Sequence, residues 1–185
     1  DEVAELDGTL TAEELERVNY NDEVTIENTM NPKAILTTNY GVIEIELYED
    51  LMPVTAGNFA KLVEEDFYNG TKFHRVIDGF MIQGGCPDGR GSGGPGYTIN
   101  AEFNERPHNP GTLSMARTSD PNSAGSQFFI CLERQASLDN QYTVFGETAD
   151  AESLEVVQKI GAVKTDGSDK PLDDVTIKSV TVVAM

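Results

Sequence analysis

The sequence predicts a mainly β protein, in which two helices close the ends of an antiparallel barrel. Two observations lead to this prediction. Short apolar or alternating runs recur along the chain between turn-rich stretches, and only two segments show the helical spacing of apolar residues. The length of 185 residues is sufficient for one ordinary domain with a short appendage.

The first two strands are expected at residues 34–38 and 43–48, joined by a turn at residues 39–41. Apolar and polar residues alternate in the second of them, which gives this strand one dry and one wet face. Pro53 precedes the first helix, which ends before Asn69-Gly70. Its apolar face is formed by Ala56, Phe59, Ala60 and Val63.

The later elements follow the same logic. Asp150 is the expected N-cap of the second helix, which stops at Gly161. Further strands are expected at residues 73–77, 80–83, 111–116, 127–132, 142–145 and 175–183.

The net charge of −19, from 32 acidic and 13 basic residues, argues against a nucleic-acid partner, because binding to a polyanion needs Lys and Arg to neutralise phosphates. No apolar run has the length of a membrane span, so no membrane partner is expected. The acidity is compatible with a calcium-rich surface or with an origin in high salt.

The charge is concentrated near the start of the chain, where residues 1–30 contain ten acids and one base. We therefore divide the chain into an acidic N-terminal extension, residues 1–32, and a folded domain, residues 33–185. A capping box from Thr11 to Glu14 predicts that the extension is partly helical.

Metal and cofactor sites are not expected. Residues 7–15 resemble the second half of an EF-hand loop, but Val3 stands where the first carboxylate ligand belongs. A solvated acidic turn is therefore preferred, with calcium binding as the alternative. His74 and His108 lie in no zinc motif and are expected to be surface or packed residues.

The cellular location is predicted from the cysteines and from the start of the chain. Cys86 and Cys131 form no C-x-x-C motif, and two reduced thiols favour a cytoplasmic protein. The chain starts at Asp1 without Met, so removal of an upstream piece, with an exported form, stays open as the alternative.

Residues 84–96 are rich in glycine and contain G-x-G-x-x-G twice. A dinucleotide loop must lead into a helix, whereas this segment leads into extended chain. Nucleotide binding is therefore excluded, and the glycines are interpreted as the rim of a groove, where close approach of a ligand needs small residues.

Arg75 lies in a strand that is rich in large apolar residues, where a lone guanidinium is costly to desolvate. It is expected either to point into a groove or to be tied to a neighbouring carboxylate. Farther along the chain, strand spacing places Gln127 and Phe129 on one face and Phe128 and Ile130 on the other.

Four ordered motifs closely resemble the cyclophilin family of peptidyl-prolyl cis/trans isomerases. They are FHRVIDGFMIQGG at 73–85, GTLSMA at 111–116, NSAGSQFFI at 122–130, and LD at 138–139 with VFG at 144–146. The resemblance covers residues 33–185. It implies a closed eight-stranded antiparallel barrel capped by two helices, with a groove on its outer face that binds an X-Pro peptide.

The resemblance also implies the roles of individual residues. The catalytic residues would be Arg75, Phe80 and Gln83. The substrate-binding residues would be Met81, Ala116, Arg117, Gln127, Phe129, Leu138 and Tyr142. No metal or cofactor is needed, because a catalyst of amide rotation only has to favour the twisted state over the two planar ones.

Three departures from the family pattern stand out. The stretch at 117–121 is one residue longer than in familiar eukaryotic members and is of the bacterial and archaeal type, as is Tyr142. Ser137 stands where many members have Trp or Phe. Loss of this aromatic residue should open one wall of the proline pocket, so weakened binding of cyclosporin-type ligands is expected.

The sequence therefore predicts a peptidyl-prolyl cis/trans isomerase that acts on proline-containing peptides and unfolded protein segments and assists folding. The alternative is a noncatalytic module of the same fold that holds proline-containing partners. A monomer is expected in either case.

Overall fold

The structure is a computed structural model that describes residues 31–184. The predicted capping-box helix and the calcium-binding alternative lie outside the described residues. None of the described helices is long and apolar enough to cross a bilayer.

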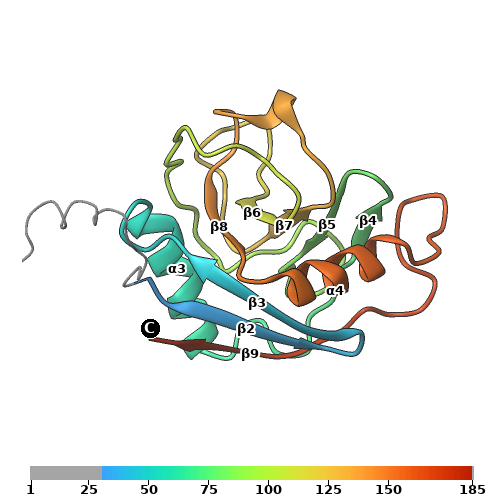
Figure 1. Cartoon of the computed structure of the whole chain (residues 1–185). Coiled ribbons are helices and arrows are strands. Elements are labelled where there is room, and N and C mark those ends of the chain that lie inside the picture. Colours follow the sequence, from blue (N-terminus) through green and yellow to red (C-terminus); the bar gives the residue numbers. More distant parts are fainter. Residues whose placement is uncertain (1–30, 185) are drawn as a thin grey trace, which may run out of the picture. The chain divides into compact units, whose positions relative to one another are not determined.

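The described chain forms one eight-stranded sheet, in which every neighbouring pair is antiparallel (Figure 1). The order across the sheet is β4-β5-β7-β6-β8-β3-β2-β9. The strands are β2 (Lys33–Thr38), β3 (Gly41–Leu47), β4 (Arg75–Ile77), β5 (Met81–Gly84), β6 (Thr112–Met115), β7 (Phe128–Cys131), β8 (Val144–Thr148) and β9 (Ile177–Val183). The helices are α3 (Pro53–Glu64), α4 (Ala151–Gly161) and the short 3₁₀ helix η2 (Ala136–Leu138). The predicted mainly β fold with two α-helices is confirmed.

The predicted closed barrel would need a ladder of hydrogen bonds between β4 and β9, the two edge strands. Within residues 31–184 these two strands do not pair with each other. The segments that precede them meet instead, since the amide of Phe73 donates to the carbonyl of Val175 at 2.9 Å. The amide of Val76, in the middle of the three-residue β4, donates to Asp169 at 2.8 Å. The loop around Asp169 therefore occupies the edge that β9 would need, and the sheet curls without closing.

Alternation along the strands separates two apolar clusters. Phe128 and Ile130 of β7 belong to the main core, whereas Phe129 and Cys131 of the same strand pack with Met81 in a second, smaller cluster. Phe59 of α3 packs on Phe128, with ring centroids 5.7 Å apart. One face of β7 thus packs on the main core, and its other face contributes to a separate apolar surface.

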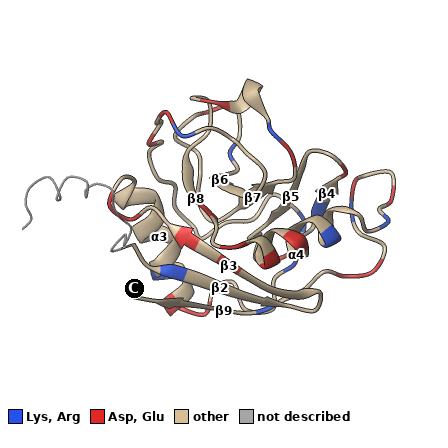
Figure 2. Ribbon diagram, in the orientation of Figure 1, with Lys and Arg blue, Asp and Glu red and all other residues tan. Residues whose placement is uncertain are grey.

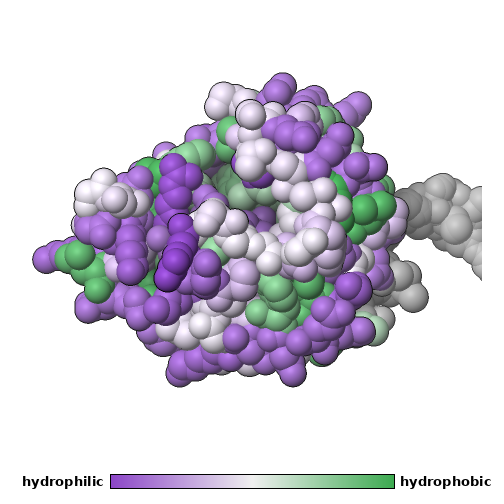
Figure 3. All heavy atoms as spheres, turned by 180° about the vertical axis from the view of Figure 1, so that it is seen from behind, coloured by the Kyte–Doolittle hydropathy of each residue, from purple (hydrophilic) through white to green (hydrophobic). Residues whose placement is uncertain are grey.

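Few large apolar side chains reach the surface of the described residues. On the face seen in Figure 3, hydrophilic side chains dominate and the apolar areas are separate from one another.

Gly85 follows β5 and lies at a point where the backbones that flank β5 and β7 approach each other closely. Its φ is +89°, and an added Cβ would lie 2.5 Å from the carbonyl oxygen of Ser126. We expect Gly85→Ala to lower the free energy of unfolding by about 2–4 kcal/mol, from backbone strain and overpacking together.

Gly89 is the matched control, because its φ is +73° and nothing lies within 4 Å of an added Cβ. Gly89→Ala should cost only about 1 kcal/mol, from the backbone conformation alone. Urea unfolding of the two variants measures the difference, and equal losses would contradict the close approach.

Candidate active site

Two adjoining cavities lie on the face of the sheet that carries the smaller apolar cluster. The smaller cavity has a volume of about 130 Å³, and the larger one has about 440 Å³. Gln83, Ala116 and Arg117 line both of them. A ligand in one cavity can therefore continue into the other.

The smaller cavity has an apolar floor. Phe129 is 5% exposed, and its ring lies against the ring of Tyr142 edge-on, with centroids 5.8 Å apart. Met81 is buried, and the partly buried Phe80 and Leu138 pack on the same cluster. The floor is an apolar surface that is formed by a few packed side chains.

Arg75 stands at the rim of this cavity, at the first residue of β4 and opposite Gln83 of β5. Its Nη1 donates to Oε1 of Gln83 at 3.4 Å. Arg75 forms no salt bridge within residues 31–184. Of the two expectations for this side chain, the described residues match the one in which it faces a groove.

A line of amides continues from Arg75 into the larger cavity. Nε2 of Gln83 donates to Oε1 of Gln127 at 3.0 Å, and Nε2 of Gln127 donates to the carbonyls of Gly91 and Gly93. These bonds fix which end of each amide carries the oxygen. The Gln83 oxygen therefore faces Arg75.

The glycine-rich segment forms one wall of the larger cavity, from Gly91 to Thr98. Its interpretation as the rim of a groove fits this position. The sulfur of Cys86, which is fully buried, accepts hydrogen bonds from the amides of Gly91 at 3.2 Å and Gly93 at 3.3 Å. The wall is thus tied to the protein on both sides, by Cys86 and by Gln127.

Arg117 lies between the two cavities. Its guanidinium carbon is 4.4 Å from the centre of the Tyr142 ring, which is the distance of a cation–π contact. Nε and Nη2 donate to the carbonyl of Gln141 at 3.1 and 2.6 Å, and Nη1 donates to the carbonyl of Thr118 at 2.9 Å. These contacts hold a positive charge in a fixed place.

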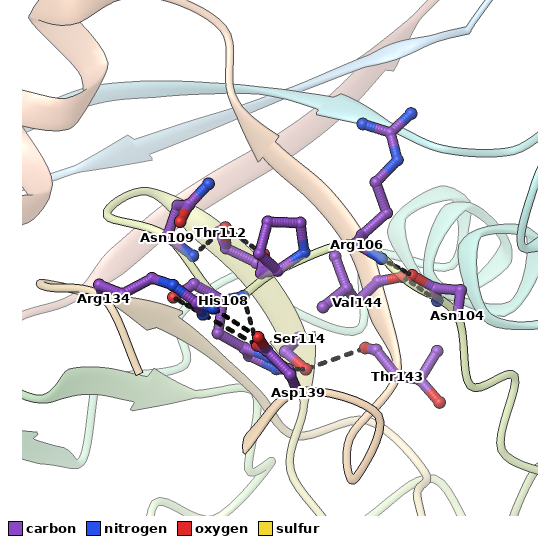
Figure 4. Close-up of polar contacts among 11 residues, drawn as sticks. Asn104, Arg106, His108, Asn109, Thr112, Ser114, Arg134, Asp139, Thr143 and Val144 are labelled. Atoms are coloured by element: carbon purple, nitrogen blue, oxygen red, sulfur yellow. Dashed lines mark hydrogen bonds and ion pairs between the residues drawn. The ribbon is translucent and has the colours of Figure 1, made fainter. Parts of the chain in front are cut away.

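A polar network lies beneath the apolar floor (Figure 4). The fully buried His108 ring is stacked on Phe129, with centroids 6.0 Å apart. Its Nδ1 lies 3.1 Å from Oδ1 of Asp139, and its Nε2 lies 3.0 Å from Oγ of Ser114. Arg134 binds the same carboxylate with both Nη atoms, at 3.0 and 2.6 Å. Because Asp139 follows Leu138 directly, the network positions two parts of the floor, the Phe129 ring and the Leu138 side chain at the end of η2.

The network sets the charge of its members. The hydrogen bonds from Arg134 hold the pKa of the Asp139 carboxyl well below its usual range. Burial lowers the pKa of His108, and the Asp139 carboxylate opposes this shift only in part. Burial also lowers the pKa of His74. Both histidines are therefore neutral in the folded protein near pH 7.

These shifts predict how stability depends on pH. In the unfolded chain a histidine gains its proton near pH 6.5, whereas the folded protein resists this proton until lower pH. The free energy of unfolding should therefore fall as the pH is lowered from about 7 to 5. Each of the two histidines can contribute at most about 1.4 kcal/mol to this fall for every pH unit. Urea unfolding across this range measures it, and His108→Gln should flatten the profile. A flat wild-type profile would contradict the prediction.

All ten residues predicted for the site lie at these two cavities. Nine of them line the smaller cavity, and Gln127 lines the larger one. From the sequence, His108 was predicted only to be a surface or packed residue, and no role was predicted for Arg134 or Asp139. The one available signal was the position of Asp139 next to Leu138 in the LD motif. No group of three or more His, Cys, Asp or Glu residues that could hold a metal ion occurs within residues 31–184.

Fold and site together define a β-sheet protein with a surface groove, in which an apolar pocket adjoins a row of polar and positively charged groups. Residues 33–182 match the family described as cyclophilin-type peptidyl-prolyl cis-trans isomerase/CLD. The chain belongs to this family.

Individual relatives agree with this assignment. A peptidyl-prolyl cis-trans isomerase of Synechococcus elongatus is 53% identical over 128 residues, which are 69% of this chain and 88% of that protein. The peptidyl-prolyl cis-trans isomerase A of Mycobacterium tuberculosis is 42% identical over 178 residues, with 87% of this chain and 97% of that protein covered. The prediction of an isomerase of this family is confirmed.

A solved structure shows the same fold. The crystal structure of a Cryptosporidium parvum cyclophilin-type peptidyl-prolyl cis-trans isomerase in the presence of the dipeptide Ala-Pro has a TM-score of 0.77 and 36% sequence identity. The match covers 83% of this chain and 99% of that chain.

Proposed function

We propose that this chain accelerates rotation about X-Pro bonds in the smaller cavity, and that Arg75 is the catalytic residue. The observation that carries this proposal is the guanidinium of Arg75, which stands beside an apolar pocket, faces the Gln83 amide and has no carboxylate partner within residues 31–184. It is a positive charge at the rim of the pocket that is available to a substrate.

The reaction needs no nucleophile. The peptide bond resists rotation by about 18–20 kcal/mol, because the nitrogen lone pair is delocalised into the carbonyl. In the twisted transition state this delocalisation is lost, and the prolyl nitrogen regains its lone pair. A donor that is already in place stabilises this lone pair more than the planar ground states, and this difference lowers the barrier.

The apolar floor suits the proline ring. Phe129, Met81 and Leu138 would hold the ring while the residue before it rotates, and Phe80 would close the pocket beside Arg75. The Nε2 group of Gln83 has a second N–H besides the one that binds Gln127, and it would donate to a substrate carbonyl. The Ala-Pro dipeptide of the Cryptosporidium parvum structure supports proline-containing peptides as the substrate class.

The larger cavity would receive neighbouring residues of the same peptide, because it shares Gln83, Ala116 and Arg117 with the smaller one. Gln127 would line this second subsite. Ser137 is exposed on η2 and lines neither cavity, so it offers no wall to a large cyclic ligand. Weak binding of cyclosporin-type ligands is therefore part of the proposal.

Isomerase activity is tested with a proline peptide of the Ala-Pro type. Exchange between its cis and trans forms takes tens to hundreds of seconds without a catalyst, and we expect the wild-type chain to bring it to the millisecond range of NMR exchange spectroscopy. Peptide binding without faster exchange would instead support the noncatalytic binding module.

A further inference from the structure

The two cavities differ in charge from the rest of the protein. The chain has 32 acidic and 13 basic residues, and the acidic residues are spread along the described ribbon (Figure 2). The residues that line the two cavities nevertheless include Arg75 and Arg117 and no Asp or Glu. The groove is therefore locally positive on an acidic protein.

Arg117 is the cation that the reaction itself does not need. Arg75 lines only the smaller cavity, where the proposed rotation takes place, whereas Arg117 lines both cavities. Nε, Nη1 and Nη2 of Arg117 each make bonds to backbone carbonyls, and a guanidinium has further N–H groups beyond these. Because carbonyls are neutral partners, the positive charge of Arg117 is not cancelled.

The nearby carboxylates have other partners. Asp139 is bound by Arg134 and His108, and Oδ1 of Asp120 accepts from the amide of Asn122 at 2.9 Å. Within residues 31–184, no carboxylate lies within salt-bridge distance of Arg117. An acidic group from outside would thus meet an unpaired cation.

The attraction of an acidic ligand group to Arg117 competes with repulsion from the acidic residues of the protein, and distance determines which effect is larger. At about 0.15 M salt, charges separated by more than ~8 Å of solvent are largely screened. A carboxylate in contact with Arg117 lies well inside this length, whereas repulsion from acidic side chains that are farther away than this is largely screened. The local attraction therefore outweighs the general repulsion.

We infer that this isomerase prefers X-Pro segments that carry an acidic side chain close to the proline, and that Arg117 is the residue that determines this preference. The inference rests on the proposed function of the groove. A residue extends the chain by about 3.3–3.6 Å, so a side chain in the larger cavity belongs to a residue within about three positions of the proline.

The test uses pairs of X-Pro peptides that differ only by Glu against Gln at one position, scanned over about three positions on each side of the proline. At one position we expect KM to be about fivefold lower for the Glu peptide, with kcat nearly unchanged. Raising NaCl from about 0.05 M to about 1 M should remove most of this difference. Equal KM values for Glu and Gln at every position would overturn the inference.

Variants separate Arg117 from the net charge. Arg117→Gln should abolish the preference for Glu, and Arg117→Glu should shift it to Lys peptides. Arg106→Gln is the matched control, because it changes the net charge by the same amount as Arg117→Gln. Arg106 lies over the Tyr48 ring and lines neither cavity, so this variant should keep the preference for Glu. A preference that survives in Arg117→Gln would also overturn the inference.

The result is distinguishable from a failure of the proposed function. Dissociation constants of the same peptide pairs, from chemical-shift titration, report the charge preference without any turnover. If no peptide is isomerised, the proposed function fails while the titration still decides the role of Arg117. If Arg117→Gln does not fold, the inference is tested on the wild type alone, by the KM values of the peptide pairs and their dependence on salt.

Discussion

Replacing Arg75 with alanine is expected to lower kcat/KM for a proline peptide by about 100- to 1000-fold, the range found when one preorganised donor is removed from an active site. The guanidinium is exposed and forms no salt bridge within residues 31–184, so the protein loses its donor to the twisted bond but almost no packing. NMR exchange spectroscopy or a protease-coupled assay measures the loss.

Two variants control this experiment. Arg75→Lys retains a positive charge without the planar fork of donors, so its kcat/KM should lie between those of the wild type and the alanine variant. Arg106→Ala removes an exposed arginine that lines neither cavity, and its kcat/KM should stay within about twofold of the wild type. If Arg75→Ala keeps more than about a third of the wild-type kcat/KM, Arg75 is not the catalytic residue.

Phe128 and Phe129 are neighbours on β7, and their replacement by alanine is expected to have opposite main effects. Phe128 packs in the main core against Phe59, Tyr68 and Phe73, so Phe128→Ala should lower the free energy of unfolding by about 3–5 kcal/mol. The cavity floor would remain, and kcat/KM of the folded fraction should stay near the wild-type value.

Phe129→Ala removes the floor on which the proline ring is expected to rest. The fall in kcat/KM should be at least about tenfold, mainly through KM, because ~1.4 kcal/mol of apolar contact with the ring is lost. Stability should also fall, since Phe129 is buried between His108 and Tyr142. Urea unfolding and peptide kinetics on both variants measure the contrast, and similar kinetics for the two would show that the ring does not bind at Phe129.

The sequence predicted the elements whose causes are local. The alternation in β3 follows from the two-residue repeat of side chains along a strand, and its apolar residues Ile43, Ile45 and Leu47 are buried as expected. Asp150 accepts from the amide of Ser153 at 2.8 Å, as predicted for the N-cap of α4. In both cases the deciding residues lie within a few positions of each other.

Helix α3 shows where local information ends. Its N-cap residue, Met52, provides no side-chain cap. The amides of Val54 and Thr55 donate instead to the carboxylate of Glu102, at 3.2 and 2.7 Å. This partner is almost fifty residues away in the sequence. Its role is visible only after the chain has folded.

By itself, the sequence determined the mainly β fold and the two helices, because strand periodicity and capping are properties of short segments. The set of residues that line the groove was implied by the resemblance of four ordered motifs to the cyclophilin family. Only the tertiary structure decided that the sheet stays open between β4 and β9, that His108 lies under Phe129, and that Arg117 is held over Tyr142. Each of these three features involves residues from distant segments of the chain. Their geometry depends on how all the elements pack at once, which no local pattern encodes.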